Sequence, residues 1–286
     1  MLVYKTTTSL HLALDRERAK GKKIGFVPTM GALHDGHLSL VERSNEENDL
    51  TVVSIFVNPT QFNNPDDLKS YPRMPEVDLN ILEEANASIV FMPEVSEIYS
   101  SDSGQKKIHL DLGKLGRVME GAFRPGHFDG VVQIVRLLFE IVKPDHAYFG
   151  EKDFQQLTVI RFMTTYFNLN VEIVGCPTVR EENGLAMSSR NLRLSQKERE
   201  DAAVIAKALK FIRDNWKTAT PQELKLKAIE QIEKKNFKIE YLEIADEESL
   251  EPIHIWNVNQ KPRAFAAVFC GPVRLIDNVG LVTEQG

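Results

Sequence analysis

The fold is decided by residues 23 to 38, which read KIGFVPTMGALHDGHL. Residues 23 to 28 form a short apolar run typical of a buried strand, and a loop with glycine and histidine joins it to a helix expected near residues 36 to 48. Further strands are expected at 51 to 57, 88 to 92, 147 to 149 and 171 to 174, among helices near 9 to 20, 75 to 86, 128 to 142 and 153 to 167. This alternation predicts a parallel sheet covered on both faces, whose ligands bind at the carboxyl ends of the strands.

The remainder of the chain predicts a second domain. The 286 residues suit two domains of ordinary size, and the 42% of hydrophobic residues are enough to form cores without disulfides or metals. Cys176-Pro177 ends the alternation, so we expect a first domain at 1–177 and a smaller α/β domain at 178–286. The second domain is expected to contain helices near 196 to 213 and 221 to 234, and strands near 238 to 244, 264 to 270 and 273 to 276.

Charge and composition argue against several classes of protein. The chain carries 35 basic and 41 acidic residues, a formal net charge of −6. General binding to nucleic acids or anionic membranes is favoured by a basic surface, so this charge argues against both. No apolar run approaches the ~20 residues of a membrane span, and the first residues lack the apolar segment of a secretory signal. Cys176 and Cys270 are far apart, which suits a reducing compartment, and we expect both to be buried, inert thiols.

The loop after the first strand carries the first candidate site. His34 and His37 lie three residues apart where a helix begins, so they would share one face. A helix start attracts phosphate through its unpaired N–H groups, and imidazoles there can stabilise charge that develops on phosphorus. A polar loop with a helix cap explains this motif equally well when it is considered alone. Zinc is disfavoured because no cysteine or third histidine lies nearby.

Four other polar segments lie in loops or at helix starts, most of them directly after predicted strands. Asn58 to Arg73 is a proline-punctuated loop whose neutral amides suit a hydroxylated substrate, or form a solvated turn cluster. Arg124 to Phe128 could add positive charge near a phosphate, and a simple loop-to-helix junction is the alternative interpretation. Gly150 to Gln156 could bind a nucleotide or be an ordinary helix start. Met187 to Asn191 could be a mobile phosphate clamp or a polar linker.

Taken together, four of these segments are similar to the pantothenate synthetase (pantoate–β-alanine ligase) family. The resemblance is carried by Pro28 to His37, Phe56 to Phe62, Phe149 to Asp153 and Met187 to Arg190. It is dense over residues 24 to 195 and looser in the second domain. The resemblance implies a Rossmann-like amino-terminal domain of the HIGH-motif nucleotidyltransferase class, a smaller carboxy-terminal lid, a homodimer, and a role in cytoplasmic coenzyme A biosynthesis.

The same resemblance implies a reaction in two steps. Pantoate attacks the α-phosphorus of ATP to give pantoyl adenylate and pyrophosphate, and β-alanine then displaces AMP to give pantothenate. ATP is a substrate and Mg²⁺ is implied with it. The small molecules pantoate, β-alanine and ATP are the expected partners, together with a second copy of the chain, and neither nucleic acid nor membrane is expected.

The resemblance also implies roles for individual residues. His37 is the expected proton donor or charge stabiliser, and His34, Lys152 and Arg190 are the other expected catalytic groups. Gln61 and Gln156 are expected to bind pantoate, and Gln61 also β-alanine. The acidic run of the family is interrupted here as Glu76-Val77-Asp78, so metal contact is expected at Asp78 alone. The expected ATP-binding residues are Met30, Gly31, Ala32, Leu33, His34, Asp35, Gly36, His37, Gly150, Glu151, Lys152, Asp153, Val179, Met187, Ser188, Ser189 and Arg190.

Two other classes of function stay open at this point. One is another small-molecule adenylyltransferase of the same fold, which makes a stable nucleotide product. The other is a non-catalytic nucleotide sensor or RNA-binding module derived from a synthetase-like core. The acidic net charge argues against RNA binding. A non-catalytic sensor would not need the complete set of phosphate-directed residues that this chain contains.

Overall fold

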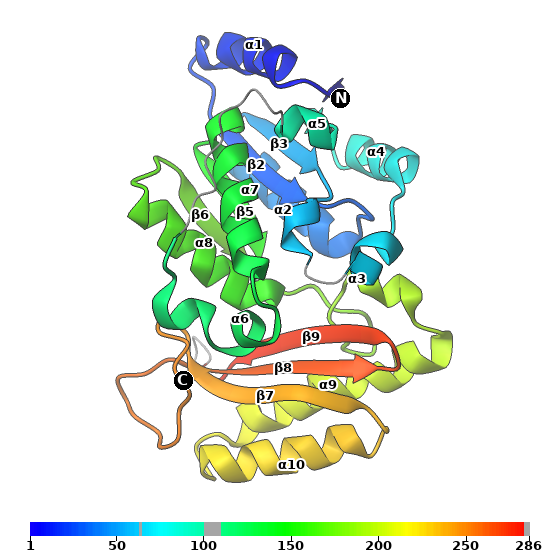
Figure 1. The fold of residues 1–286 in the computed structure, drawn as a ribbon, viewed down its shortest axis with the longest axis vertical. Helices are drawn as coiled ribbons and strands as arrows, with labels where there is room; N and C mark the ends of the chain where they lie inside the picture. Colours follow the sequence, from blue (N-terminus) through cyan, green and yellow to red (C-terminus); the bar gives the residue numbers. More distant parts are fainter. Residues whose placement is uncertain (63–64, 100–109, 283–286) are drawn as a thin grey trace. The chain divides into compact units, whose positions relative to one another are not determined.

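The computed structural model describes residues 1–62, 65–99 and 110–282, which form two compact units (Figure 1). The first unit comprises Met1–Asp111, Arg124–Glu151 and Gln156–Pro177, and the second comprises Leu112–Phe123, Lys152–Gln155 and Thr178–Gly286. The sequence places a domain boundary after residue 177, where the main division also falls. Residues 112–123 and 152–155, which the sequence assigns to the first domain, cluster instead with the second unit.

The first unit is built on a parallel sheet, which confirms the predicted α/β class. Six strands pair in the order β1-β4-β3-β2-β5-β6. From β2 the chain proceeds through β3 to β4 on one side and later returns to place β5 on the other side of β2. In parallel α/β folds, ligands bind where the connections leave in opposite directions, which here is at the carboxyl ends of β2 and β5. The strands are β1 (Leu2–Tyr4), β2 (Ile24–Thr29), β3 (Leu50–Ile55), β4 (Ile89–Phe91), β5 (His146–Gly150) and β6 (Glu172–Cys176).

The longer helices lie close to their expected positions, because their apolar residues recur at helical spacing. The short helices were not predicted, since a few residues are too short to show a helical periodicity. No helix in the described part of the chain is long and apolar enough to cross a membrane. The helices that begin in the first unit or its connections are α1 (Thr7–Arg18), α2 (Asp35–Glu47), η1 (Pro59–Gln61), α3 (Pro65–Ser70), α4 (Pro75–Glu84), α5 (Val95–Ile98), α7 (His127–Val142), η4 (Glu151–Asp153) and α8 (Phe154–Tyr166).

Alternation along β2 explains how the sheet is covered. Val27 belongs to a buried cluster with Leu40 and Val41 of α2 and with Leu82 of α4. Its neighbour Phe26 makes an edge-to-face contact with Phe139 of α7, with ring centroids 6.3 Å apart. Successive strand residues face opposite sides, so α2 and α4 cover one face and α7 the other.

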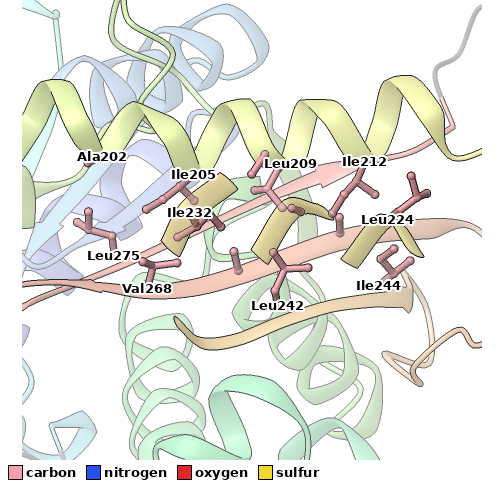
Figure 2. Packing of buried hydrophobic residues seen from close by; sticks show 14 of the residues in the cluster. Ala202, Ile205, Leu209, Ile212, Leu224, Ile232, Leu242, Ile244, Val268 and Leu275 are labelled. Atoms are coloured by element: carbon pink, nitrogen blue, oxygen red, sulfur yellow. The ribbon is translucent and has the colours of Figure 1, made fainter. Parts of the chain in front are cut away.

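The second unit is an antiparallel three-stranded sheet with two long helices packed on one face (Figure 2). Ile205 and Leu209 of α9 contact the sheet together with residues of α10. Burial of each such side chain contributes about 1.5–3 kcal/mol. The elements of this unit are η3 (Gly113–Gly116), α6 (Met119–Phe123), η5 (Ser189–Arg193), α9 (Gln196–Asn215), α10 (Pro221–Glu233), β7 (Lys238–Asp246), β8 (Pro262–Cys270) and β9 (Val273–Gly280).

The opposite face of this small sheet explains why residues 112–123 and 152–155 belong to the second unit. Phe265 of β8 packs against Phe154, with ring centroids 6.0 Å apart, and the Arg263 guanidinium lies 3.8 Å from the centroid of the Phe154 ring. Met119 and Leu250 complete this buried cluster. The apolar residues of the two short segments are therefore part of the core of the second unit.

A buried group of charges joins α6 to the same sheet. The Arg274 guanidinium donates to both oxygens of Glu120, at 2.9 and 2.6 Å, and its Nε donates to Glu240 at 2.9 Å. The Tyr241 hydroxyl donates to Glu120 at 2.7 Å. Burial opposes the charge of Arg274, but the two carboxylates outweigh it and raise the pKa of the guanidinium. Burial, followed by the negative charge of Glu120, raises the pKa of Tyr241 well above its usual value.

We predict that Arg274→Met lowers the free energy of unfolding of the second unit by about 3–5 kcal/mol, because it leaves the buried Glu120 and the half-buried Glu240 without their cation. Trp216 and Trp256 are the two tryptophans of the chain and lie in this unit, so their fluorescence during urea denaturation reports its unfolding. Arg213→Met is the control, since Arg213 pairs with Asp214 at the surface and its loss is expected to change stability by less than about 1 kcal/mol. Equal effects of the two substitutions would contradict the prediction.

Candidate active site

The loop after β2 has an unusual backbone that its neighbours hold in place. Gly31 and Ala32 have positive φ angles of 81° and 49°. The Gly31 N–H donates to the Thr29 hydroxyl at 3.3 Å, and this hydroxyl donates to the Ser54 carbonyl at 2.7 Å. The N–H groups of Ala32 and Leu33 donate to the carboxylate of Asp78, at 2.9 and 2.8 Å. Three successive backbone amides are therefore bonded inside the protein.

His34 and His37 close the start of α2 as a capping box. The Gly36 N–H donates to Nδ1 of His34 at 3.1 Å, and the His34 N–H donates to Nδ1 of His37 at 3.4 Å. The ring centroids are 4.1 Å apart. Because Nδ1 accepts in both rings, each neutral imidazole carries its proton on Nε2, the nitrogen that can donate to an anionic oxygen. The predicted pair thus lies where the strand order reverses, at the start of a helix whose dipole favours negative charge.

The loop after β3 places Gln61. The Asn58 amide donates to the Gly130 carbonyl at 3.1 Å, and the Asn58 carbonyl oxygen accepts from the Tyr99 hydroxyl at 2.7 Å. The Gln61 side chain is 9% exposed, and its Nε2 lies 2.7 Å from the sulfur of Met30. The structure therefore brings the predicted substrate amide next to the loop that follows β2. Asn63 and Asn64 of the same sequence motif lie outside the described residues.

The segment from Arg124 to Phe128 supports this loop from α7. Nδ1 of the buried His127 donates to the Gln61 carbonyl at 2.8 Å, and Arg124 donates to Nε2 of the same ring at 3.1 Å. A Cβ atom at Gly130 would lie 2.5 Å from the Thr60 carbonyl oxygen, so only glycine allows this close approach. Sequence reasoning suggested a phosphate contact or a simple junction, whereas the observed contacts fix the backbone of Gln61.

The end of β5 contributes Gly150 and Glu151, which are half-buried and follow the neighbour of β2 in the sheet. The two glutamines at the start of α8 differ in role. The Gln155 side chain donates to the carbonyls of Leu115 and Val118 and accepts from the Glu120 N–H, at 2.8, 2.9 and 3.0 Å. Gln156 is half-buried and belongs to the first unit.

The other predicted ATP residues belong to the second unit, where a hairpin carries Val179 and Met187. The Met187 N–H donates to the Val179 carbonyl at 3.0 Å, and Arg180 pairs with Ala186. Both terminal nitrogens of Arg180 donate to the buried Asp277 of β9, at 2.7 and 3.0 Å. Neither residue of this pair was predicted, because no local pattern reveals a partner so far along the chain. Lys152, Asp153, Ser188, Ser189 and Arg190 also lie in this unit.

Asp78 is the expected metal contact, and its surroundings do not suit a metal ion. Within the described residues, no group of three or more His, Cys, Asp or Glu residues is placed to hold a metal ion. Both oxygens of Asp78 accept backbone N–H groups, and the residue is 2% exposed. Mg²⁺ requires octahedral oxygen ligands and keeps several waters, for which a buried carboxylate is poorly suited. The residues present therefore do not fit a protein-held magnesium ion.

The cysteines offer no nucleophile. Cys176 and Cys270 are 3% and 1% exposed, and burial raises the pKa of each thiol to about 11. A thiol with such a pKa is protonated at neutral pH and unreactive. The chemistry of the site therefore falls to imidazoles, amides and cationic side chains.

A parallel sheet with a reversal of strand order, followed by imidazole donors at a helix start, defines an α/β protein suited to a phosphate-bearing ligand. A family model for pantoate-beta-alanine ligase matches residues 2–280. The chain belongs to this family.

Individual relatives agree along almost the whole chain. The pantothenate synthetase of Bacteroides thetaiotaomicron is 50% identical over 280 residues, which cover 98% of both chains. A pantothenate synthetase structure from Thermus thermophilus has a TM-score of 0.92 at 42% identity, covering 99% of this chain and 100% of that one. The pantoate-beta-alanine ligase of Francisella tularensis, solved in complex with beta-gamma ATP and beta-alanine, has a TM-score of 0.82 at 37% identity and is matched over 100% of both chains.

Proposed function

We propose that this protein is an AMP-forming ligase that condenses (R)-pantoate with β-alanine to pantothenate through a pantoyl-adenylate intermediate. The observation that carries the proposal is the pair His34 and His37, whose Nε2 atoms can donate to phosphate at the start of α2. Membership of the pantoate–beta-alanine ligase family supports it. ATP is proposed as a substrate because a family member was solved with a form of ATP together with β-alanine.

In the first step a carboxylate oxygen of pantoate attacks the α-phosphorus of ATP, and the bond to the β-phosphate oxygen breaks to release pyrophosphate. Such a displacement depends mainly on positioning and on neutralisation of charge. Nε2–H of His37 is proposed to donate to an oxygen that gains charge, with His34 holding the phosphates beside it. No covalent intermediate with the protein is needed, which agrees with the buried, protonated thiols.

Gln61 and Gln156 are proposed to hold pantoate. Nε2 of Gln61 now donates to the sulfur of Met30, which is a weak acceptor. A carboxylate or hydroxyl oxygen is a much better acceptor, so this N–H can turn to pantoate at little cost. The Gln61 amide can also donate to the carboxylate of β-alanine, as the family resemblance implies.

In the second step the amine of β-alanine attacks the acyl carbon of the adenylate, the bond from that carbon to the AMP oxygen breaks, and the amine loses a proton. The mixed anhydride makes this possible, because AMP is a good leaving group, whereas a free carboxylate does not acylate an amine at neutral pH. Gly150 to Asp153, Val179 and Met187 to Arg190 are proposed to complete ATP binding, with Lys152 and Arg190 balancing its charge.

Several finer features stay predictions. A Mg²⁺ requirement, a homodimer, a cytoplasmic location and a lid role for the second unit are implied by the family resemblance. The same holds for the absence of nucleic acid among the partners, which the net charge of −6 supports. Another small-molecule adenylyltransferase, or a non-catalytic nucleotide sensor, is an outcome that the product assay below distinguishes.

We predict that AMP and pyrophosphate form in equal amounts, and that steady turnover requires pantoate, β-alanine, ATP and Mg²⁺ together. Chromatography of the nucleotides and an enzymatic pyrophosphate assay measure both products. Each substrate is omitted in turn as a control. Steady formation of ADP would contradict the ligase, a stable adenylated product after addition of β-alanine would indicate another adenylyltransferase, and no turnover at all would indicate a sensor.

We predict that His37→Ala folds normally and lowers the rate of adenylation by about 10²-fold or more, the loss expected when one preorganised charge-stabilising donor is removed. His37→Gln is the matched variant, because its amide N–H keeps a donor near the position of Nε2 and should retain more activity. Single-turnover measurement of AMP formation with excess enzyme tests both variants. Near-normal rates in His37→Ala, or its failure to fold, would assign the histidine to structure alone.

A further inference from the structure

Asp78 is a buried carboxylate that the proposed reaction does not use. It lies in the first helical turn of α4 and is 2% exposed. Its two oxygens accept the N–H groups of Ala32 and Leu33, at 2.9 and 2.8 Å, from the loop that leads to His34. The start of α4 stabilises the negative charge, since the helix dipole favours anions at this end. Both oxygens of the carboxylate are therefore already engaged by the protein.

The loop depends on this carboxylate for its shape. Gly31 and Ala32 both have left-handed backbone conformations, with φ angles of 81° and 49°, and such a conformation is unfavourable for an alanine. A Cβ atom at position 31 would lie 2.9 Å from Oδ2 of Asp78 and 3.2 Å from Cγ2 of Ile55. The carboxylate thus packs directly against the backbone of the loop and bonds the two amides that follow Gly31.

The consequence extends to the histidines. Leu33 directly precedes His34, whose N–H donates to His37 and whose ring accepts from Gly36. A shift of the Ala32 and Leu33 backbone would move both imidazoles together, because the capping box joins them. We infer that Asp78 is a positioning residue that fixes the loop from which His34 and His37 act, and that it does not ligate Mg²⁺. This inference rests on the proposed function of the two histidines.

The same contacts limit how ATP can bind to this loop. The amides of Gly31, Ala32 and Leu33 already donate to Thr29 and Asp78. Nucleotide contacts of the loop therefore fall to its carbonyl oxygens and to the side chains of the histidines, since the N–H groups of His34, Gly36, His37 and Leu38 also donate within the protein. If the nucleotide brings Mg²⁺, its phosphates rather than Asp78 would hold the ion.

The test compares Asp78→Asn with Glu76→Gln. The asparagine turns an amide N–H toward one of the loop N–H groups and removes one acceptor. Glu76 is exposed in the same turn of α4, so Glu76→Gln removes an equal charge without touching the loop. We expect Asp78→Asn to lower kcat about 10- to 100-fold, with the Mg²⁺ concentration for half-maximal activity unchanged within twofold, and Glu76→Gln to behave like wild type.

A second readout does not depend on activity. In the wild-type protein without nucleotide, the amides of Ala32 and Leu33 should be protected from hydrogen exchange, and Mn²⁺ alone should not bind. Asp78→Asn should raise the exchange of these amides at least tenfold. These wild-type measurements hold even if the variant does not fold. They also stand apart from the proposed function, because a wild-type protein that fails to form AMP with pantoate would contradict the function and leave the exchange result intact.

Three results would overturn the inference. One is fast exchange of the Ala32 and Leu33 amides in the wild-type protein. Another is Mn²⁺ binding by the wild-type protein alone, or a tenfold or larger increase in the Mg²⁺ requirement of Asp78→Asn. The third is an equal loss of kcat in Glu76→Gln, which would assign the effect to the charge of the helix start rather than to the contact with the loop.

Discussion

Pairing of β2 with β3 on one side and β5 on the other is the constraint on which the first unit depends. Because the chain leaves this central strand in opposite directions, the loops that follow β2 and β5 begin at the same edge of the sheet, where ligands of parallel α/β folds bind. The His34–His37 pair follows β2, and Gly150 ends β5. Gln61 follows β3, and contacts with α7 set the position of its backbone. The reversal of strand order thus determines where the polar groups of the first unit converge.

Buried polar contacts then hold segments that the apolar cores leave undetermined. Asp78 accepts hydrogen bonds from the loop after β2, and His127 donates one to the loop after β3. Asp277 accepts hydrogen bonds from Arg180 in the hairpin that carries Val179. Asp78 and His127 satisfy backbone groups that a bend in the chain would leave unpaired, whereas Asp277 accepts from the side chain of Arg180. An unpaired buried group costs about 1–3 kcal/mol. Such contacts make a loop rigid enough to present imidazoles or amides in a fixed direction.

The sequence predicts the parts of this structure that depend on local pattern. The central strands are short, buried apolar runs and the longer helices have helical periodicity, so both were predicted to within a few residues. β1 was missed because its Leu2 and Val3 are exposed and it does not form a buried apolar run. The assignment of residues 152–155 depends on Phe154 packing against Phe265, more than a hundred residues later, which no local pattern shows. Most candidate site residues directly follow strands, so their place could be predicted from the sequence. The contacts that Asp78 and His127 make come from distant parts of the chain, so the sequence did not reveal them.

The central claim is that the site transfers AMP to pantoate before any amine is involved. Isotope exchange between labelled pyrophosphate and ATP tests this most directly, because it requires a reversible adenylation step. We expect label to enter ATP when pantoate is present and β-alanine is absent, and not to enter when pantoate is omitted. Exchange without pantoate, or exchange that appears only after β-alanine is added, would contradict it.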